Sequence, residues 1–396
     1  MNAEQNRDFP HKSNINFLAF CSVSPLNGPA SRRVIHGIQR QTEVGRGMLF
    51  EFVGEEHIAS RFHRNFAQLM KTSPENITMT TNTSQPLGMI ANGYPFEPGD
   101  EIISYINEYP ANHYPWVIQN RRRGVKLHLL SDVDVPQEDR EYTEPVSPDF
   151  ARGWSFDELE SLVNERTRMI AISHVQFTSG YAADLPRLGE FCKSKNIDLV
   201  VDAAQGMGCL PLYPEQWNIS AVAAAGWKWM MGPVGTGVLY TSPDFRDKIE
   251  ITMSGADQMK QDTEYLDHTW DPHSTGQKFE YSTVTYAALD GLSVGIEELF
   301  LPRTLESIRD RNFELQELAL KSLDVNKYQP VVLRPKNRSG ILSLIPNTRP
   351  ATEISTLLDQ KNIIITPRDG YLRFAPHFCS TEQEVQLAVQ ALNEID

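Results

Sequence analysis

The chain has few cysteines and no excess of positive charge. Its four cysteines lie in a chain of 396 residues and none has a CxxC spacing, so no zinc knuckle, redox pair or disulfide scaffold is indicated. The net charge of −14 argues against a nucleic-acid-binding surface or a polybasic membrane anchor. We therefore expect no metal site and no nucleic-acid partner.

Long apolar runs and several familiar motifs are also missing. No segment approaches the ~20 apolar residues that a membrane-spanning helix requires. Residues 1–16 are polar and lack the apolar core of a signal peptide. The expectation is a soluble cytoplasmic protein without a membrane partner. The GxGxxG, P-loop, HExxH and GxSxG patterns do not occur either, which disfavours a nicotinamide-binding oxidoreductase.

What the chain does contain is a regular alternation of apolar strands and amphipathic helices. The expected strands are 77–80, 101–105, 125–130, 168–173, 199–202, 221–227 and 237–240. The helices between them are expected near 54–71, 84–93, 111–123, 155–165 and 184–194. Such alternation predicts an α/β fold with a mostly parallel, seven-stranded sheet that helices cover.

The pattern changes after about residue 284. Two helical stretches near 285–299 and 301–324 are followed by short strands and helices up to the C-terminus, which predicts a smaller α+β domain. A chain of 396 residues is too long for one compact core, so two domains are expected. The predicted organisation has an N-terminal segment (1–22) that packs with the small domain, a large cofactor-binding domain (23–284) and the small C-terminal domain (285–396).

Lys228 lies in an unusually apolar setting of Trp, Met and Gly residues. Lysine is seldom buried without a partner, and burial favours the neutral amine that attacks carbonyl groups. Asp202, at the end of an apolar strand, is the complementary acid. Pyridoxal phosphate requires a lysine that forms a Schiff base and an acid that keeps its ring nitrogen protonated. This pair predicts a pyridoxal-phosphate enzyme and disfavours a non-catalytic protein.

Other polar residues stand where a ligand site is expected, each with a simpler alternative. Thr83 and Ser84 follow a strand and open a helix, where N–H groups and hydroxyls bind phosphate or form an ordinary cap. Arg368 and Arg373 flank a turn, where an arginine grips a carboxylate or forms a salt bridge. His174 ends a strand at the ligand-binding edge of such sheets and is either functional or structural.

One motif carries a resemblance to a known family. Gly226-Trp227-Lys228, followed by Gly232-Pro233-Val234-Gly235-Thr236-Gly237, resembles the GHK…GPxGxG motif of the class V aminotransferase and cysteine desulfurase superfamily. These are pyridoxal-phosphate enzymes of fold-type I, and the similarity extends from about Phe17 to the C-terminus. The stretch 372–378 looks like the C-terminal motif of the kynureninase and isopenicillin-epimerase-like members.

The resemblance implies how the cofactor is held. Lys228 would carry it as a Schiff base, Asp202 would pair with its ring nitrogen and Gln205 would contact its ring hydroxyl. Thr83 and Ser84 would hold its phosphate.

Further roles follow from the same resemblance. Tyr109 would stack on the cofactor ring, and Thr283 would reach the phosphate of a partner subunit, which implies a homodimer. Arg373, or alternatively Arg368, would bind the carboxylate of a small amino acid substrate.

The chain departs from the family pattern in three ways. Ala225 replaces the usual Ser, and Trp227 replaces the usual His, although an indole N–H also donates to phosphate. The loop 368–371 contains no cysteine, which argues against sulfur transfer through a persulfide. We therefore expect chemistry at Cα of an amino acid, with Lys228 as general base. Transamination ranks first, with C–S β-elimination or epimerisation as the alternative.

Overall fold

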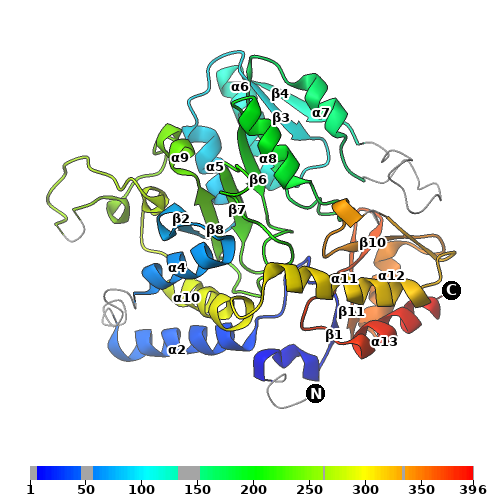
Figure 1. The fold of residues 1–396 in the computed structure, drawn as a ribbon. Coiled ribbons are helices and arrows are strands. Elements are labelled where there is room, and N and C mark those ends of the chain that lie inside the picture. Colours follow the sequence, from blue (N-terminus) through cyan, green and yellow to red (C-terminus); the bar gives the residue numbers. More distant parts are fainter. Residues whose placement is uncertain (1–6, 46–56, 133–151, 262–263, 332–334, 396) are drawn as a thin grey trace.

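The computed structural model describes residues 7–45, 57–132, 152–261, 264–331 and 335–395. At its centre is a seven-stranded sheet with the order β2-β8-β7-β6-β5-β3-β4 (Figure 1). Its strands are β2 (Ile77–Thr80), β3 (Glu101–Tyr105), β4 (Lys126–Leu130), β5 (Thr167–Ser173), β6 (Asp198–Asp202), β7 (Ala221–Ala225) and β8 (Gly237–Thr241). The strands from β7 to β4 run parallel, and β8 runs antiparallel to both neighbours. This confirms the predicted mostly parallel sheet.

Helices cover both faces of this sheet because its strands are apolar on both faces. Along β6, Val200 packs with the core on one side of the sheet, and Leu199 and Val201 pack with the core on the other. Alternate side chains of a strand point to opposite faces, so both faces need a cover. The covering helices are α4 (Ile58–Met70), α5 (Ser84–Gly93), α6 (Tyr114–Arg123), α7 (Phe156–Leu162), α8 (Leu185–Ser194) and α9 (Pro243–Lys248).

A smaller antiparallel sheet follows in the C-terminal part, with the order β12-β13-β10-β9 (Figure 1). Its strands are β9 (Tyr328–Pro330), β10 (Leu342–Pro346), β12 (Thr366–Arg368) and β13 (Tyr371–Phe374). Three helices build a separate apolar core with it, namely α11 (Leu305–Ser322), α12 (Ala351–Asp359) and α13 (Glu382–Asn393).

The N-terminal segment lies against this C-terminal part. β1 (Asn16–Phe17) pairs in parallel with β11 (Ile363–Ile364). Lys12 forms an ion pair with Glu384 of α13, with 2.6 Å between Nζ and Oε2. Residues 1–6 of the predicted segment 1–22 lie outside the described residues, and the division into three parts stays a prediction.

Two helices near the sheet differ from what the sequence indicated. No helix was expected at α2 (Gly28–Val44), where Ile35 and Ile38 are exposed and blur the apolar stripe. α10 (Tyr286–Gly295) lies against α2 and α4, so the first part of 285–299 belongs with the large sheet rather than with the small one. A π-helical turn (Ile296–Phe300) then leads to α11. The apolar content of this stretch predicts a helix but does not reveal which core receives it.

Candidate active site

Lys228 lies on a tight loop at the carboxyl edge of the large sheet. β7 ends at Ala225, and the loop closes through two hydrogen bonds of 2.8 Å, from Gly226 N–H to the Thr236 carbonyl and from Gly232 N–H to the Gly226 carbonyl. A Cβ on Gly226 would stand 2.3 Å from the Thr236 hydroxyl oxygen, so glycine is required there. The loop thereby brings Lys228 to the edge at which β6 ends in Asp202.

Burial opposes the charge of both Lys228 and Asp202. It lowers the pKa of Lys228 and raises the pKa of Asp202, while the attraction between the two groups opposes each shift. Asp202 is buried, and its Oδ1 accepts a hydrogen bond of 2.9 Å from Ala204 N–H. The positive charges of Arg373 and Arg368 lower the pKa of Lys228 further. This surrounding favours a neutral amine at Lys228, as the sequence suggested.

Tyr109 lies over the same lysine. Its ring centroid is 5.6 Å from Lys228 Nζ, and its ring meets the Phe177 ring edge-on with 5.3 Å between the centroids. The side chain is 45% exposed, so one part of the ring stays open to a ligand. The expected aromatic residue is thus next to the lysine, and its stacking role stays a prediction.

The start of α5 has the features of an anion site. Thr83 is buried at the N-cap position, and its side chain makes no capping hydrogen bond. Asn82 Oδ1 caps the helix instead, accepting from Gln85 N–H at 2.8 Å. Ser84 is exposed at the first helical position. The Thr83 and Ser84 hydroxyls are therefore not needed as caps, which suits a phosphate at the positive end of the helix.

Gln205 is bound at both ends of its amide. Its Nε2 donates to the Cys21 carbonyl at 2.9 Å, and its Oε1 accepts from the Trp229 indole at 3.0 Å. Within the described residues the second N–H of this amide makes no hydrogen bond, so it suits the contact with a ring hydroxyl that the resemblance implied. Trp227 is partly buried and its carbonyl accepts from Ser24 N–H at 2.9 Å.

The two candidate arginines differ in burial. Arg373 of β13 is 2% exposed, and its Nη1 donates to the Phe177 carbonyl at 2.8 Å. Its Nε is buried and has no hydrogen-bond partner in the described part of the chain. A donor of this kind suits a carboxylate. Arg368, at the end of β12, is exposed.

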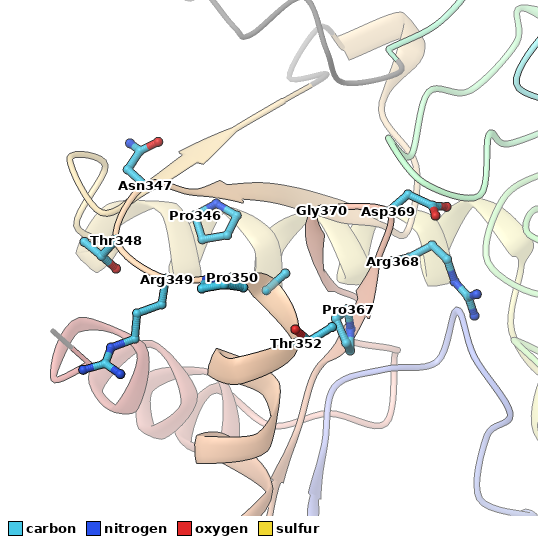
Figure 2. Close-up of a pocket in the computed structure, with 11 residues that line it drawn as sticks. Pro346, Asn347, Thr348, Arg349, Pro350, Thr352, Pro367, Arg368, Asp369 and Gly370 are labelled. Carbon is cyan, nitrogen blue, oxygen red and sulfur yellow. The ribbon is translucent and has the colours of Figure 1, made fainter.

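Arg368 also lines a cleft of about 600 Å³ beside the turn between β12 and β13 (Figure 2). Arg349 lies on the far side of this cleft, and the two arginine side chains point away from each other (Figure 2). The cleft belongs to the small sheet and not to the Lys228 loop. The candidate acid, aromatic ring and buried arginine all lie near Lys228 instead.

The donor set at Lys228 fits pyridoxal phosphate. It offers an amine inclined to be neutral, a buried carboxylate at Asp202, the Tyr109 ring and the uncommitted hydroxyls at the start of α5. In the same order, these groups suit the aldehyde, the ring nitrogen, the flat ring and the phosphate of the cofactor.

Comparison with known proteins decides the family. The family model described as Aminotransferase class-V matches residues 39–371. The chain belongs to the aminotransferase class-V family. This membership confirms the resemblance and the expectation of an enzyme with pyridoxal phosphate as its cofactor.

Curated relatives of this class-V chain match over nearly its full length. A probable cysteine desulfurase of Methanothermobacter thermautotrophicus is 25% identical, with 98% of this chain and 96% of the relative covered. The uncharacterized aminotransferase YcbU of Bacillus subtilis is 22% identical, with 98% and 97% covered. These names divide between two reaction types.

Solved structures share the fold. A C-DES variant with glycine covalently linked to its pyridoxal-phosphate cofactor superposes with a TM-score of 0.86 at 18% identity, covering 99% of each chain. C-DES, described as a cystine C-S lyase, in complex with its reaction product cysteine persulfide gives a TM-score of 0.84 at 18% identity, covering 98% of this chain and 99% of that one. Both likenesses confirm the predicted fold-type I architecture of this class-V chain.

Of three further side chains around the class-V site, the sequence singled out His174 as functional or structural and gave no role to Glu108 and Ser173. His174 is buried against Gly206, and burial lowers its pKa to about 4, which keeps the imidazole neutral. Glu108 is buried beside Ser173, and both lie close to Asp202. Two sequence features could have pointed to these residues. Glu108 directly precedes Tyr109, and Ser173 ends an apolar strand.

Among the described residues, no helix combines the length and apolarity that crossing a membrane requires. The same part of the chain holds no group of three His, Cys, Asp or Glu side chains able to bind a metal ion.

Proposed function

We propose that this class-V enzyme breaks the C–S bond of a sulfur-containing amino acid by β-elimination. The observation that carries the proposal is the set of charges at Lys228, where Asp202 lies on the sheet edge and Arg373 on the small sheet. This arrangement brings a base and a group that can bind a carboxylate near each other from two parts of the fold. The proposal reverses the order in which the sequence ranked transamination and elimination.

Four residues of the site have distinct roles in the proposed reaction. The Arg373 guanidinium holds the α-carboxylate of the substrate, and the neutral Lys228 amine takes the proton from Cα. Asp202 stabilises positive charge on the ring nitrogen, and Tyr109 shields one face of the ring from water. Bound pyridoxal phosphate supplies the electron sink that stabilises negative charge at Cα. The electron pair left at Cα forms a double bond to Cβ as the Cβ–S bond breaks, and sulfur leaves with that bond's electrons.

The burial of the four cysteines supports release of the sulfur without its transfer to a thiol of the enzyme. Cys21, Cys192 and Cys209 are buried, and Cys379 is partly buried. Burial raises the pKa of all four thiols, which disfavours the reactive thiolate. The sulfur would therefore leave on the small product, as thiol or persulfide. Several relatives are named probable cysteine desulfurases, and the C-DES neighbour is described as a C-S lyase, which supports chemistry at a C–S bond.

The test offers purified holoenzyme cystine, cysteine and alanine, each with and without a 2-oxo acid. We expect ammonia and pyruvate from a sulfur amino acid alone, and none from alanine, which has no leaving group at Cβ. Lys228→Ala should lose the visible cofactor band that borohydride removes from the parent, together with all activity above about 0.1%. Cys379→Ser should keep parental activity.

Transamination is the second candidate, since the Bacillus subtilis relative is named an aminotransferase. Product that forms only when the 2-oxo acid is present would replace β-elimination by transamination. Loss of optical activity without any other product would indicate epimerisation. A protein without a visible band after addition of the cofactor would overturn the cofactor assignment.

We also infer a homodimer. Thr283 is exposed on the segment that follows the 3-10 helix Gly276–Phe279. An exposed hydroxyl there suits the role implied by the family resemblance, a contact with the phosphate in the partner subunit.

A further inference from the structure

Glu108 is a buried carboxyl group whose two oxygens both face Ser173. Its Oε1 accepts a hydrogen bond of 2.7 Å from Ser173 N–H, and its Oε2 contacts the Ser173 hydroxyl. Ser173 is the last residue of β5 and is paired in register with Asp202 of β6. Glu108 therefore ties the chain that follows β3 to the sheet edge that carries Asp202.

This tie also fixes the backbone of Tyr109, the next residue. Tyr109 is the N-cap of a short 3-10 helix (Pro110–Asn112), and its ring centroid is 5.6 Å from Lys228 Nζ. The ring is 45% exposed and packs edge-on against the Phe177 ring. Its place over Lys228 depends on where the Glu108 anchor puts the backbone.

The environment of Glu108 keeps its carboxyl group uncharged at neutral pH. Burial and, to a smaller degree, the negative charge of Asp202 raise its pKa to about 8, against the opposing effect of hydrogen bonds from Ser173 and Asn112. The ionisable groups that face Glu108 are Asp202 from β6 and Tyr105 from β3. A neutral Glu108 leaves Asp202 as the anion beside Lys228, and an ionised Glu108 adds a second one.

We propose that Glu108 is a positioning residue of the active site, which holds Tyr109 over Lys228 and sets the charge next to Asp202. This inference rests on the proposed cofactor site. It assigns Glu108 no contact with the substrate or the cofactor, since its oxygens are engaged by Ser173.

A matched control exists at the other end of β6. Asp198 is also a buried carboxylate, with its Oδ2 2.7 Å from the Tyr94 hydroxyl and 2.9 Å from Lys248 Nζ. It is four residues from Asp202 on the same strand, hence about 13 Å away. Asp198→Asn therefore perturbs a buried carboxylate of the same sheet without touching the active site.

The experiment measures cofactor dissociation constants and the absorbance of the cofactor band from pH 6 to 10. In Glu108→Ala, cofactor binding should weaken about tenfold, because Ser173 loses its acceptor and Tyr109 its anchor. Glu108→Gln should restore affinity to within about threefold, since the amide oxygen accepts from Ser173 N–H and the amide nitrogen donates to its hydroxyl. In the parent, ionisation of Glu108 should change the cofactor band near pH 8, and Glu108→Gln should remove this change. Asp198→Asn should leave both readouts at parental values.

The apoprotein gives an independent readout through its melting temperature. A carboxyl group with a raised pKa in the folded state stabilises the fold at low pH, and this contribution is lost as pH rises toward about 8. The difference in melting temperature, Glu108→Gln minus parent, should therefore increase from pH 5 to 8 and then level off.

The outcomes separate the two proposals. A parent that forms no cofactor band overturns the cofactor site and the role of Glu108 together. A parent that forms the band while Glu108→Ala matches Asp198→Asn in cofactor affinity overturns the role of Glu108 alone. If Glu108→Ala does not fold, Glu108→Gln decides, because a spectral pH profile identical to that of the parent also overturns it.

Discussion

Among single residues, burial separates the two arginines that the sequence could not rank. Both lower the pKa of Lys228, but Arg373 is buried with a free Nε, whereas Arg368 is exposed at the cleft. Arg373→Lys keeps the positive charge and loses the planar fork, so KM should rise about 10- to 100-fold while cofactor affinity stays within about threefold. Arg368→Ala should change KM by less than about threefold.

Steady-state kinetics with the best substrate, together with a cofactor titration, check this prediction. Arg349→Ala is the matched control because it removes another exposed arginine from the same cleft. A larger rise of KM in Arg368→Ala than in Arg373→Lys would move the carboxylate contact to Arg368.

A functional residue could be proposed from the sequence where both its side-chain chemistry and its position near the end of a predicted strand were evident. Asp202 and Tyr109 both lie near Lys228 in the structure, and the roles of the three residues stay predictions. Glu108 was missed as a functional residue because its role depends on the end of β5, which is distant in sequence. The sequence near Glu108 contains no partner for its carboxyl group, so its role could be inferred only once β5 was seen to place Ser173 beside it.

For helices and strands, the spacing of apolar residues along the sequence decided which elements could be predicted. The strands of the large sheet were found because they are continuous apolar runs between turns. α2 was missed because Ile35 and Ile38 face outward. α10 was expected as a helix, but its residues are apolar on several sides, so the sequence did not show that it packs on α2 and α4.

The last helix offers a test of local capping. Thr381 caps α13 by accepting from Glu384 N–H at 3.2 Å, while Glu384 Oε2 accepts from Thr381 N–H at 2.6 Å. Thr381→Ala should lower the free energy of unfolding by about 1 kcal/mol because one helix-end N–H loses its acceptor. Urea unfolding checks this value.

Thr356→Ala in α12 is the control for that cap. Its hydroxyl bonds to the Thr352 carbonyl at 2.9 Å, a mid-helix contact on the exposed surface that adds little stability. Equal destabilisation by the two variants would show that the capping box contributes nothing of its own.

At the scale of the whole molecule, the proposed active site lies where the large sheet and the C-terminal part are in contact. Trp229, next to Lys228, is fully buried, and its carbonyl contacts His377 Nε2 at 2.7 Å beyond β13. Gly340 leaves room for the indole, because a Cβ there would stand 2.5 Å from it. Arg373 reaches across from β13 to the Phe177 carbonyl at 2.8 Å. The lysine loop is therefore in direct contact with the C-terminal part through Trp229.

The proposed homodimer is the largest-scale prediction. The segment between α9 and the 3-10 helix Gly276–Phe279 extends away from the body (Figure 1), and it exposes 93% of Leu266 and 64% of Trp270. Exposed apolar side chains of this size mark an interface. The double variant Leu266→Asp with Trp270→Ala should shift the protein from dimer to monomer, because burying an aspartate in an apolar interface is unfavourable. Cofactor affinity should fall with it, since Thr283 of the partner subunit would leave the phosphate.

Light scattering at micromolar concentration, paired with a cofactor titration, checks both effects. Leu387→Asp is the control, because Leu387 is 50% exposed on α13, far along the chain from the extended segment. A parent that is monomeric and binds the cofactor fully would contradict the homodimer. A double variant that remains dimeric would place the interface elsewhere, with α2 and its exposed Ile35 and Ile38 as the next surface to change. A monomeric double variant with unchanged cofactor affinity would keep the dimer but remove Thr283 from the phosphate site.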